Sequence, residues 1–334
     1  MEEGRELPKL DEIDRTLETE SKGKRLISPA VAALVPVVVF AVGVHIYSNE
    51  LLLTYMAIYI ALAQGINIIY GFTGYLPFGY FGFFGVGAYA SGLAMLDYNV
   101  PPVLAVVIGG VAAALVGALL LPLFRLRGAY FAIGTLAASE AIYAIVSNPS
   151  LQSITNGPYG LNLAAYYSSG TAYGTAIALA AIAILAASYV RSSKFGLTLK
   201  AIRDDSYSAS MSGVNVPRQR FYAWLIAAAI AGMGGSIFGW STSVFYPQAV
   251  FDSSLSVLAI VFALFGGVGT VWGPTVGTVV LYAIYNAIGV STPQYFQLIY
   301  GLVIVLLVLF APRGLAGLRQ IKSRRATTVG AKND

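Results

Sequence analysis

The chain lacks cysteine altogether and has a single histidine, His45, among its 334 residues. The absence of cysteine excludes disulfide bonds, thiolate catalysis and cysteine-ligated metals. One histidine offers no metal cluster, and its place in an apolar stretch is typical of a packed or interfacial side chain. We therefore expect no metal site and no catalytic residue in this chain.

Charge is scarce as well, since only 10% of the residues are charged while 57% are hydrophobic. A soluble domain usually carries about 25% charged residues, because its surface must face water. A chain this apolar is expected to have lipid as its solvent and to be a multi-pass protein of the inner or plasma membrane.

The formal net charge of +5 does not indicate a nucleic-acid partner, because of where the basic residues lie. All 20 Lys and Arg fall into four patches: Arg5 to Arg25, Arg125 with Arg127, Arg191 to Arg220, and Arg313 to Lys332. A basic residue at the bilayer centre costs about 3 kcal/mol on insertion scales, and basic loops stay cytoplasmic. The four patches are therefore expected on the inside.

Apolar segments alternate consistently with this charge map and predict an all-α membrane protein with about ten transmembrane segments. The segments are 29–47, 51–70, 75–96, 101–124, 129–147, 171–190, 221–246, 254–271, 274–290 and 296–311. With both termini cytoplasmic, every basic patch falls inside, and Glu50, Asp97 and Asp252 fall outside. Eight full spans with some broken or re-entrant segments would satisfy the same charges.

We expect the chain to divide into a cytoplasmic tail over 1–27, a transmembrane domain over 28–318 that includes the cytoplasmic loop 191–222, and a basic cytoplasmic tail over 319–334. The first tail holds eight of the 15 acidic residues, unlike a cleavable signal peptide. Its apolar residues recur at near-helical spacing, which favours a short amphipathic helix, and a frayed polar tail is the alternative.

Two glycine-rich segments are unlike ordinary spans. Residues 71–92 contain seven glycines and Pro77, and residues 266–277 contain five glycines and Pro274. Glycine with proline breaks helices, and interrupted segments in transporters often mark the translocation path. A division into five plus five segments would relate the two as an inverted repeat, and small-residue helix packing is the alternative for each glycine. The candidates for the path or for helix breaks are Gly71, Gly74, Pro77, Gly79, Gly82, Gly85, Glu140, Gly266, Gly267, Gly269, Gly273 and Pro274.

The longest cytoplasmic loop between spans runs over 191–222. A short helix is expected within it, with Asp204 and Asp205 in its first turn and Gly213 at its end. A helix at this place either lies on the membrane or docks on a cytoplasmic partner, and its acidic residues favour the partner over anionic lipid.

The segment SKFGLTLKAIRDDSYSASMSGVNV in this loop resembles the coupling loop of the LivM-type permease subunit of branched-chain amino-acid ABC importers. Other stretches follow in the order of that family: GFTGYLPFGYFGFFGVGAYASG, RLRGAYFAIGTLAASE, ITNGPYGL, FGGVGTVWGPTVG and LFAPRGLAGL. The resemblance covers about residues 50–318, and RLRGAYFAI with APRGL is closer to the LivM type than to its LivH-type partner.

This resemblance implies a permease for leucine, isoleucine and valine, working with a LivH-type permease subunit, two cytoplasmic ATP-binding subunits and an extracytoplasmic solute-binding protein. ATP with magnesium would be bound by the ATPase partners. The residues assigned to the coupling loop are Lys194, Gly196, Ala201, Arg203, Asp204, Asp205, Ala209, Gly213 and Asn215. Where many ABC permeases have Glu-Ala-Ala, this chain has Tyr207, Ser208 and Ala209, so docking is expected to depend on shape and on Arg203, Asp204 and Asp205.

Other functions find less support in the residues. No glycine-rich run contains the lysine of a P-loop, so the chain is not expected to hydrolyse ATP itself. An ion-coupled secondary transporter would need several ionisable groups within its spans, whereas Glu140 is the one acidic residue in a predicted span. A related urea-type or amide-type ABC permease stays open as an alternative to the branched-chain amino-acid permease.

Glu140 itself is interpreted as a structural or gating hydrogen-bond acceptor, with substrate contact or proton relay as alternatives. Gln64, Asn67 and Asn286 also lie within spans, where interhelical hydrogen bonds are their commonest use.

Overall fold

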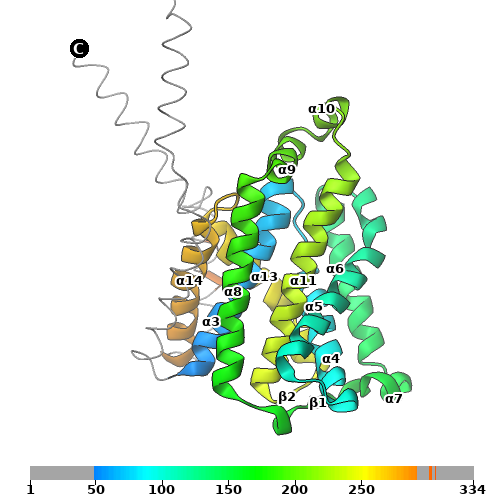
Figure 1. The fold of residues 1–334 in the computed structure, drawn as a ribbon, viewed down its shortest axis with the longest axis vertical. Helices are drawn as coiled ribbons and strands as arrows, with labels where there is room; N and C mark the ends of the chain where they lie inside the picture. The colour runs from blue at the N-terminus through cyan, green and yellow to red at the C-terminus, as the bar shows by residue number, and fades with distance from the viewer. Residues whose placement is uncertain (1–48, 292–300, 303–304, 306–334) are drawn as a thin grey trace, which may run out of the picture.

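The computed structural model describes residues 49–291, 301–302 and 305 of the chain. In the described part, long helices alternate with short helical turns and one two-stranded sheet (Figure 1). In chain order the elements are α3 (Glu50–Ile66), η1 (Asn67–Gly71), α4 (Tyr80–Tyr98), α5 (Pro102–Leu119), η2 (Leu121–Arg125), α6 (Ala129–Val146), η3 (Pro149–Leu151), α7 (Gln152–Thr155), η4 (Gly157–Tyr159), β1 (Leu161–Asn162), η5 (Ala164–Tyr166), α8 (Ser169–Ser192), α9 (Lys194–Asp204), α10 (Ser206–Met211), α11 (Val216–Thr242), β2 (Val244–Phe245), α12 (Pro247–Val250), α13 (Ser253–Gly266) and α14 (Trp272–Ser291).

Six helical stretches of the described residues are long and apolar enough to cross a membrane. They are Glu50–Gly71, Pro102–Leu119, Ala129–Val146, Ser169–Ser192, Val216–Thr242 and Pro247–Gly266. With charge so scarce along these helices, the protein is a multi-pass membrane protein, as expected. The predicted segments 29–47 and most of 296–311 lie outside the described residues, as do the two tails.

The long helices begin and end where local residues satisfy their terminal backbone groups. The side chain of Asn49 accepts from the Leu52 amide at the start of α3, at 3.2 Å. The Asp252 carboxylate accepts from the Ser254 amide at the start of α13, at 2.8 Å. At the end of α4, Asn99 has a left-handed backbone with φ of 52°, a common way to end a helix.

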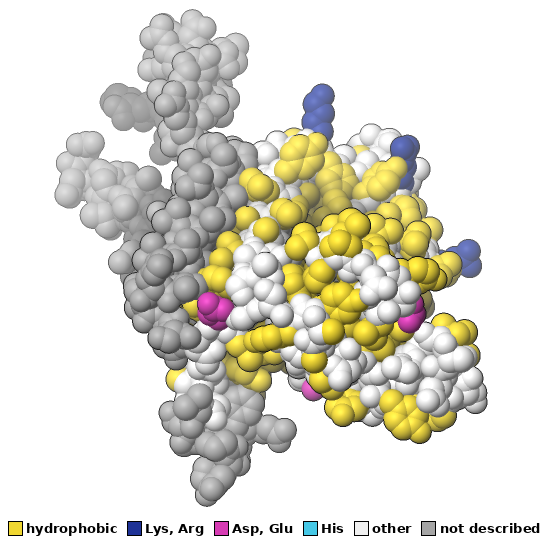
Figure 2. Space-filling view, turned by 60° about the horizontal axis from the view of Figure 1, so that its bottom comes forward, with side chains coloured by type: hydrophobic (Ala, Val, Ile, Leu, Met, Phe, Trp, Pro, Cys, Tyr) yellow, Lys and Arg dark blue, Asp and Glu magenta, His cyan; other side chains and the backbone are white. Residues whose placement is uncertain are grey.

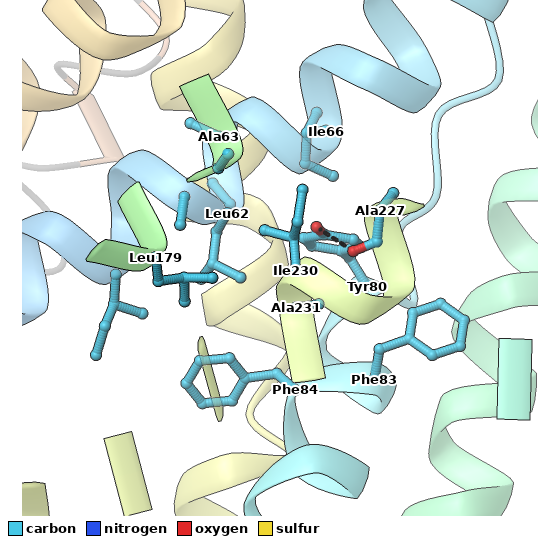
Figure 3. Packing of buried hydrophobic residues seen from close by; sticks show 14 of the residues in the cluster. Leu62, Ala63, Ile66, Tyr80, Phe83, Phe84, Leu179, Ala227, Ile230 and Ala231 are labelled. Carbon is cyan, nitrogen blue, oxygen red and sulfur yellow. Dashed lines mark hydrogen bonds between the residues drawn. The ribbon is translucent and has the colours of Figure 1, made fainter. Parts of the chain in front are cut away.

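Helix α11 packs against α3, α4 and α5, and α4 packs against α5, with α8 on α3 and α14 on α13. Figure 3 shows the resulting core, where Leu62 and Ile66 of α3 meet Phe84 of α4 and Ile230 of α11. Trp224 and Trp240 of α11 are fully buried, so α11 runs through the middle of the bundle between these two residues, whereas its first turn is exposed at Pro217 and Arg218. Its residues are 61% buried over the spanning window, against 22% for α6 at the margin of the bundle.

The bundle has two distinct ends, named here the α9 end and the sheet end. The α9 end carries α9 and α10, and the sheet end carries β1, β2 and α7 (Figure 1). Arg203 is in the last turn of α9, Arg191 is in the last turn of α8 that leads into it, and Arg127, two residues after Arg125, lies near enough to Arg220 of α11 for their charges to interact. β1 and β2 pair antiparallel, with Leu161 opposite Phe245. Figure 2 turns the sheet end forward and shows acidic side chains among apolar ones there, with Lys and Arg along the upper and right margins.

Candidate functional site

The first glycine-rich segment contains a true break in the helical path. The π-helical turn η1 ends at Gly71, the chain is irregular up to Gly79, and α4 begins at Tyr80. Segment 75–96 is therefore not one continuous helix, and its first residues, Pro77 among them, belong to this first break. At its end, Gly79 is held by α6: its amide donates to Thr135 Oγ1 at 3.3 Å, and its carbonyl accepts from Ser139 Oγ at 2.6 Å.

Close packing explains several glycines after the break. A Cβ at Gly79 would lie 1.9 Å from the Thr135 carbonyl oxygen, and one at Gly82 would lie 2.3 Å from Ser139 Oγ. A Cβ at Gly85 would lie 2.5 Å from ring atoms of Phe251. The small-residue interpretation therefore holds for these three positions, while Gly74, with φ of 78°, belongs to the break itself.

The second break lies between α13 and α14. Gly267 and Gly269 have φ values of 101° and 81°, which only glycine adopts without strain. Gly266 and Gly273 pack so closely that a Cβ at Gly266 would lie 1.8 Å from the Gly273 carbonyl oxygen. Pro274 stands in the first turn of α14, where a proline is tolerated.

The two breaks meet at the α9 end. A Cβ on Gly71 would lie 2.7 Å from the Gly269 amide nitrogen. An inverted repeat would place equivalent breaks toward opposite faces of the membrane, whereas both breaks here follow the α9 ends of α3 and α13. The predicted relation between them as repeat counterparts is therefore wrong: they are two connections on one side.

Two buried amides of the α3–η1 path hold the second break. Gln64 Nε2 donates to the Val271 carbonyl at 2.7 Å and to Thr275 Oγ1 at 2.9 Å. Asn67 Nδ2 donates to the Thr270 carbonyl, and Asn67 Oδ1 accepts from the Gly269 amide, both at 2.7 Å. These bonds satisfy backbone groups that the break removes from helical pairing. The predicted interhelical use of Gln64 and Asn67 is confirmed.

Arg203 of α9 joins the loop to both breaks. Its Nη1 donates to the Gly71 carbonyl, and it lies 3.2 Å from where a Cβ of Gly269 would stand. Two further cationic side chains lie over aromatic rings of the first break. Lys200 Nζ is 5.8 Å from the ring centre of Phe72, and the Arg220 guanidinium of α11 is 4.1 Å from that of Tyr75. These distances are within the range of cation–π attraction.

The loop over 191–222 forms two helices rather than the single one expected. α9 begins after Ser193, whose Oγ accepts from the Gly196 amide at 3.2 Å, and it runs to Asp204. Asp204 thus ends a helix instead of opening one. Asp205 caps α10, since its carboxylate accepts from the Tyr207 amide at 2.9 Å and from Ser208 Oγ at 2.5 Å. These hydrogen bonds, that of Ser208 first, lower the pKa of the Asp205 carboxyl.

The other loop candidates divide between packing and exposure. Gly196 fits tightly on Val190, whose carbonyl oxygen would lie 1.6 Å from a Cβ, and Ala209 is buried in a small cluster with Ile202. Gly213, with φ of 83°, follows α10 as predicted, and the Asn215 side chain caps α11 by accepting from the Arg218 amide at 3.2 Å. Lys194 and Ala201 are exposed.

The breaks and the loop thus come together, whereas Glu140 lies apart on an exposed side of α6. Thr135 and Ser139 were missed by sequence reasoning, because hydroxyls in an apolar helix carry no signal of their partner. Among the described residues, no cluster of three or more His, Asp or Glu side chains has the geometry to hold a metal ion.

A membrane bundle with glycine breaks joined to a basic loop is typical of transport proteins. The chain belongs to the family described as branched-chain amino acid transport system / permease component, whose model matches residues 48–308. It is similar to the high-affinity branched-chain amino acid transport system permease protein LivM of Escherichia coli, with 28% identity over 83% of this chain and 72% of the relative.

Two further relatives support the same assignment. LivM of Salmonella typhimurium is 28% identical over 78% of this chain and 68% of the relative. The LivH protein of Escherichia coli is 23% identical over 79% of this chain and 92% of the relative. The chain is thus a LivM-type transport subunit. No solved structure matches it.

Proposed function

We propose that the chain forms one half of an ATP-driven import gate for leucine, isoleucine and valine. Its partners are a LivH-type permease subunit, two cytoplasmic ATPase subunits that bind ATP with magnesium, and an extracytoplasmic solute-binding protein. The names of the relatives support the substrate, since they describe branched-chain amino acid permeases. The chain needs no cofactor of its own for this role.

The proposed topology follows from charge. The α9 end is the cytoplasmic end, because Lys and Arg gather in loops that stay inside. About ten spans with both termini cytoplasmic complete the proposal, with 29–47 and 296–311 as spans beyond the described helices.

One observation carries the coupling mechanism: Arg203 binds the Gly71 carbonyl beside Gly269. A partner that moves α9 would pull on the last turn of the α3–η1 path. The same turn is tied through Asn67 to the Gly269 amide, so both breaks receive the displacement. The binding and hydrolysis of ATP in the partner would shift the equilibrium between two arrangements of these connections.

The test is Arg203→Ala in the reconstituted complex of both permease and both ATPase subunits with the binding protein. We expect the complex to assemble and to hydrolyse ATP, while amino acid uptake per ATP hydrolysed falls about tenfold, the loss of one charge-assisted hydrogen bond. Arg127→Ala is the matched control, since it removes one positive charge at the same end without a bond to either break. Uptake per ATP that is equal in the two variants would contradict the coupling role.

A further inference from the structure

Helix α6 carries an exposed acidic residue within its span. Over its spanning window only 22% of α6 is buried. Its large exposed side chains, Tyr130, Ile133 and Ile145, lie toward its two ends, and the exposed positions between them include Ala137, Glu140, Ala141 and Ala144. Glu140 stands 11 residues after the first residue of α6, about 16 Å along the helix axis at 1.5 Å per residue. Glu140 is therefore in the middle third of this 18-residue span.

The neighbouring helix α5 shows what a lipid-facing side of this protein looks like. Its large exposed side chains are all aliphatic: Val103, Leu104, Val107, Ile108, Val111, Leu115 and Leu119. Between α5 and α11 runs a groove of about 320 Å³ that only apolar side chains line. Branched side chains of this kind suit contact with acyl chains.

Contact with acyl chains does not suit α6. A carboxylate at this depth costs on the order of 3 kcal/mol, and residues of this type almost always face the interior of a bundle or a partner group. The alanines beside Glu140 leave room for another helix to approach closely. Small side chains and a carboxylate on one side of a span together indicate protein contact.

The occupant has to bring a hydrogen-bond donor or a positive charge to the depth of Glu140. A second copy of this chain that packed through the same side of α6 about a two-fold axis would bring its own Glu140 and alanines to that depth. It would bring no basic residue, since Lys and Arg are absent from 26–124, 128–190 and 221–312. A different membrane subunit meets the requirement. The proposed function already calls for one, and this inference rests on it.

We propose that the exposed side of α6 is the surface on which the second permease subunit packs, with Glu140 accepting a hydrogen bond from a basic, amide or hydroxyl group of that subunit. The opposite side of α6 binds Gly79 through Thr135 and Ser139. One helix thereby connects the partner subunit to the first break, and Ser139 and Glu140 are consecutive residues that serve its two sides.

Photo-crosslinking tests this surface, and the absence of cysteine makes every introduced thiol unique. Ala137→Cys and Ala144→Cys on α6, with Val111→Cys and Leu115→Cys on α5 as controls, are labelled with a benzophenone maleimide in the assembled complex. Mass spectrometry after irradiation then identifies what each position reached. We expect adducts with the second permease subunit from α6 and adducts with lipid from α5.

The donor is tested by substitution at Glu140 itself. Glu140→Gln keeps an acceptor of the same shape, and we expect the second subunit to co-purify at the wild-type level. Glu140→Ala removes the acceptor, and we expect at least a tenfold rise in the concentration needed for half-maximal association of the two permease subunits in detergent. Equal association of Glu140→Ala and wild type would overturn the role of the carboxylate.

The outcomes separate this inference from the function on which it rests. If the permease pair and the ATPases co-purify and α6 crosslinks only to lipid or to a second copy of this chain, the surface is wrong and the function stands. If neither a second permease subunit nor an ATPase co-purifies with the wild-type chain, the proposed function itself is overturned.

Discussion

The two ends of the bundle connect their helices by different means. At the sheet end, β1 and β2 pair through their backbones, and the ring of Phe245 in β2 is buried. The Trp240 indole there donates to the Tyr166 carbonyl at 2.7 Å. At the α9 end, η1 and α13 stop at glycines, and side chains such as Asn67 and Arg203 replace the missing backbone partners.

This difference indicates which end is able to rearrange. A backbone ladder over a buried aromatic ring is lost only as a unit, because its parts support one another. Side chains that hold glycine breaks can exchange one carbonyl for another with small rotations. We infer that motion enters the protein at the α9 end and that the sheet end keeps the helices together.

A pair of glycine variants tests this contrast and carries the largest expected effect. Gly71→Ala places a Cβ 2.7 Å from the Gly269 amide, and Gly160→Ala places one 2.2 Å from the Phe245 carbonyl at a φ of 72°. Both substitutions overpack and should destabilise the protein by about 1–3 kcal/mol. We expect uptake to be abolished in Gly71→Ala and kept, per folded complex, in Gly160→Ala.

Thermal unfolding in detergent and uptake into proteoliposomes measure the two quantities separately. Gly170→Ala is the control, since a Cβ there meets nothing within 4 Å. Equal loss of uptake in the Gly71 and Gly160 variants would remove the distinction between the ends.

Asn67→Ala sharpens the comparison at the level of single hydrogen bonds. The substitution leaves the Gly269 amide and the Thr270 carbonyl without their partner, which costs about 1–3 kcal/mol for a buried group. Trp240→Phe at the sheet end removes one bond to Tyr166 and is expected to cost about 1 kcal/mol. Thermal unfolding compares them, and a larger loss in Trp240→Phe would mean that the amide network is not what holds the second break.

Asp205→Ala is expected to have the smallest effect, confined to α10. The carboxylate that accepts from the Tyr207 amide and from Ser208 Oγ is lost, so the Tyr207 amide should exchange faster with solvent hydrogen, whereas Asp204→Ala should leave it unchanged. Because folding lowers the pKa of Asp205, its cap contributes fully above the unfolded pKa of about 3.9 and is lost as pH falls below it. Protection of α10 that declines already between pH 8 and pH 5 would contradict this assignment.

Much of the helical layout was predictable, because apolar runs bounded by basic patches mark spans. The segments at 129–147 and 171–190 agree with α6 and α8 to within two residues at either end. The expected single loop helix was wrong, because Asp205 sits where either a continuing helix or a new cap satisfies the local rules. Here the cap formed, since Tyr207 and Ser208 both donate to its carboxylate.

Two properties follow from the amino-acid sequence alone, namely that this is a membrane protein and which of its loops carry the positive charge, since both depend on the cost of placing ionic groups in hydrocarbon. The sequence also located the two glycine-rich segments, but it did not predict that they lie in contact. Only the tertiary structure brought Gly71 against Gly269 and Arg203 onto both, because residues some 60 to 200 positions apart come together through packing. The same is true of Glu140: sequence located a carboxylate in a span, and packing decided that it faces away from the chain's own core.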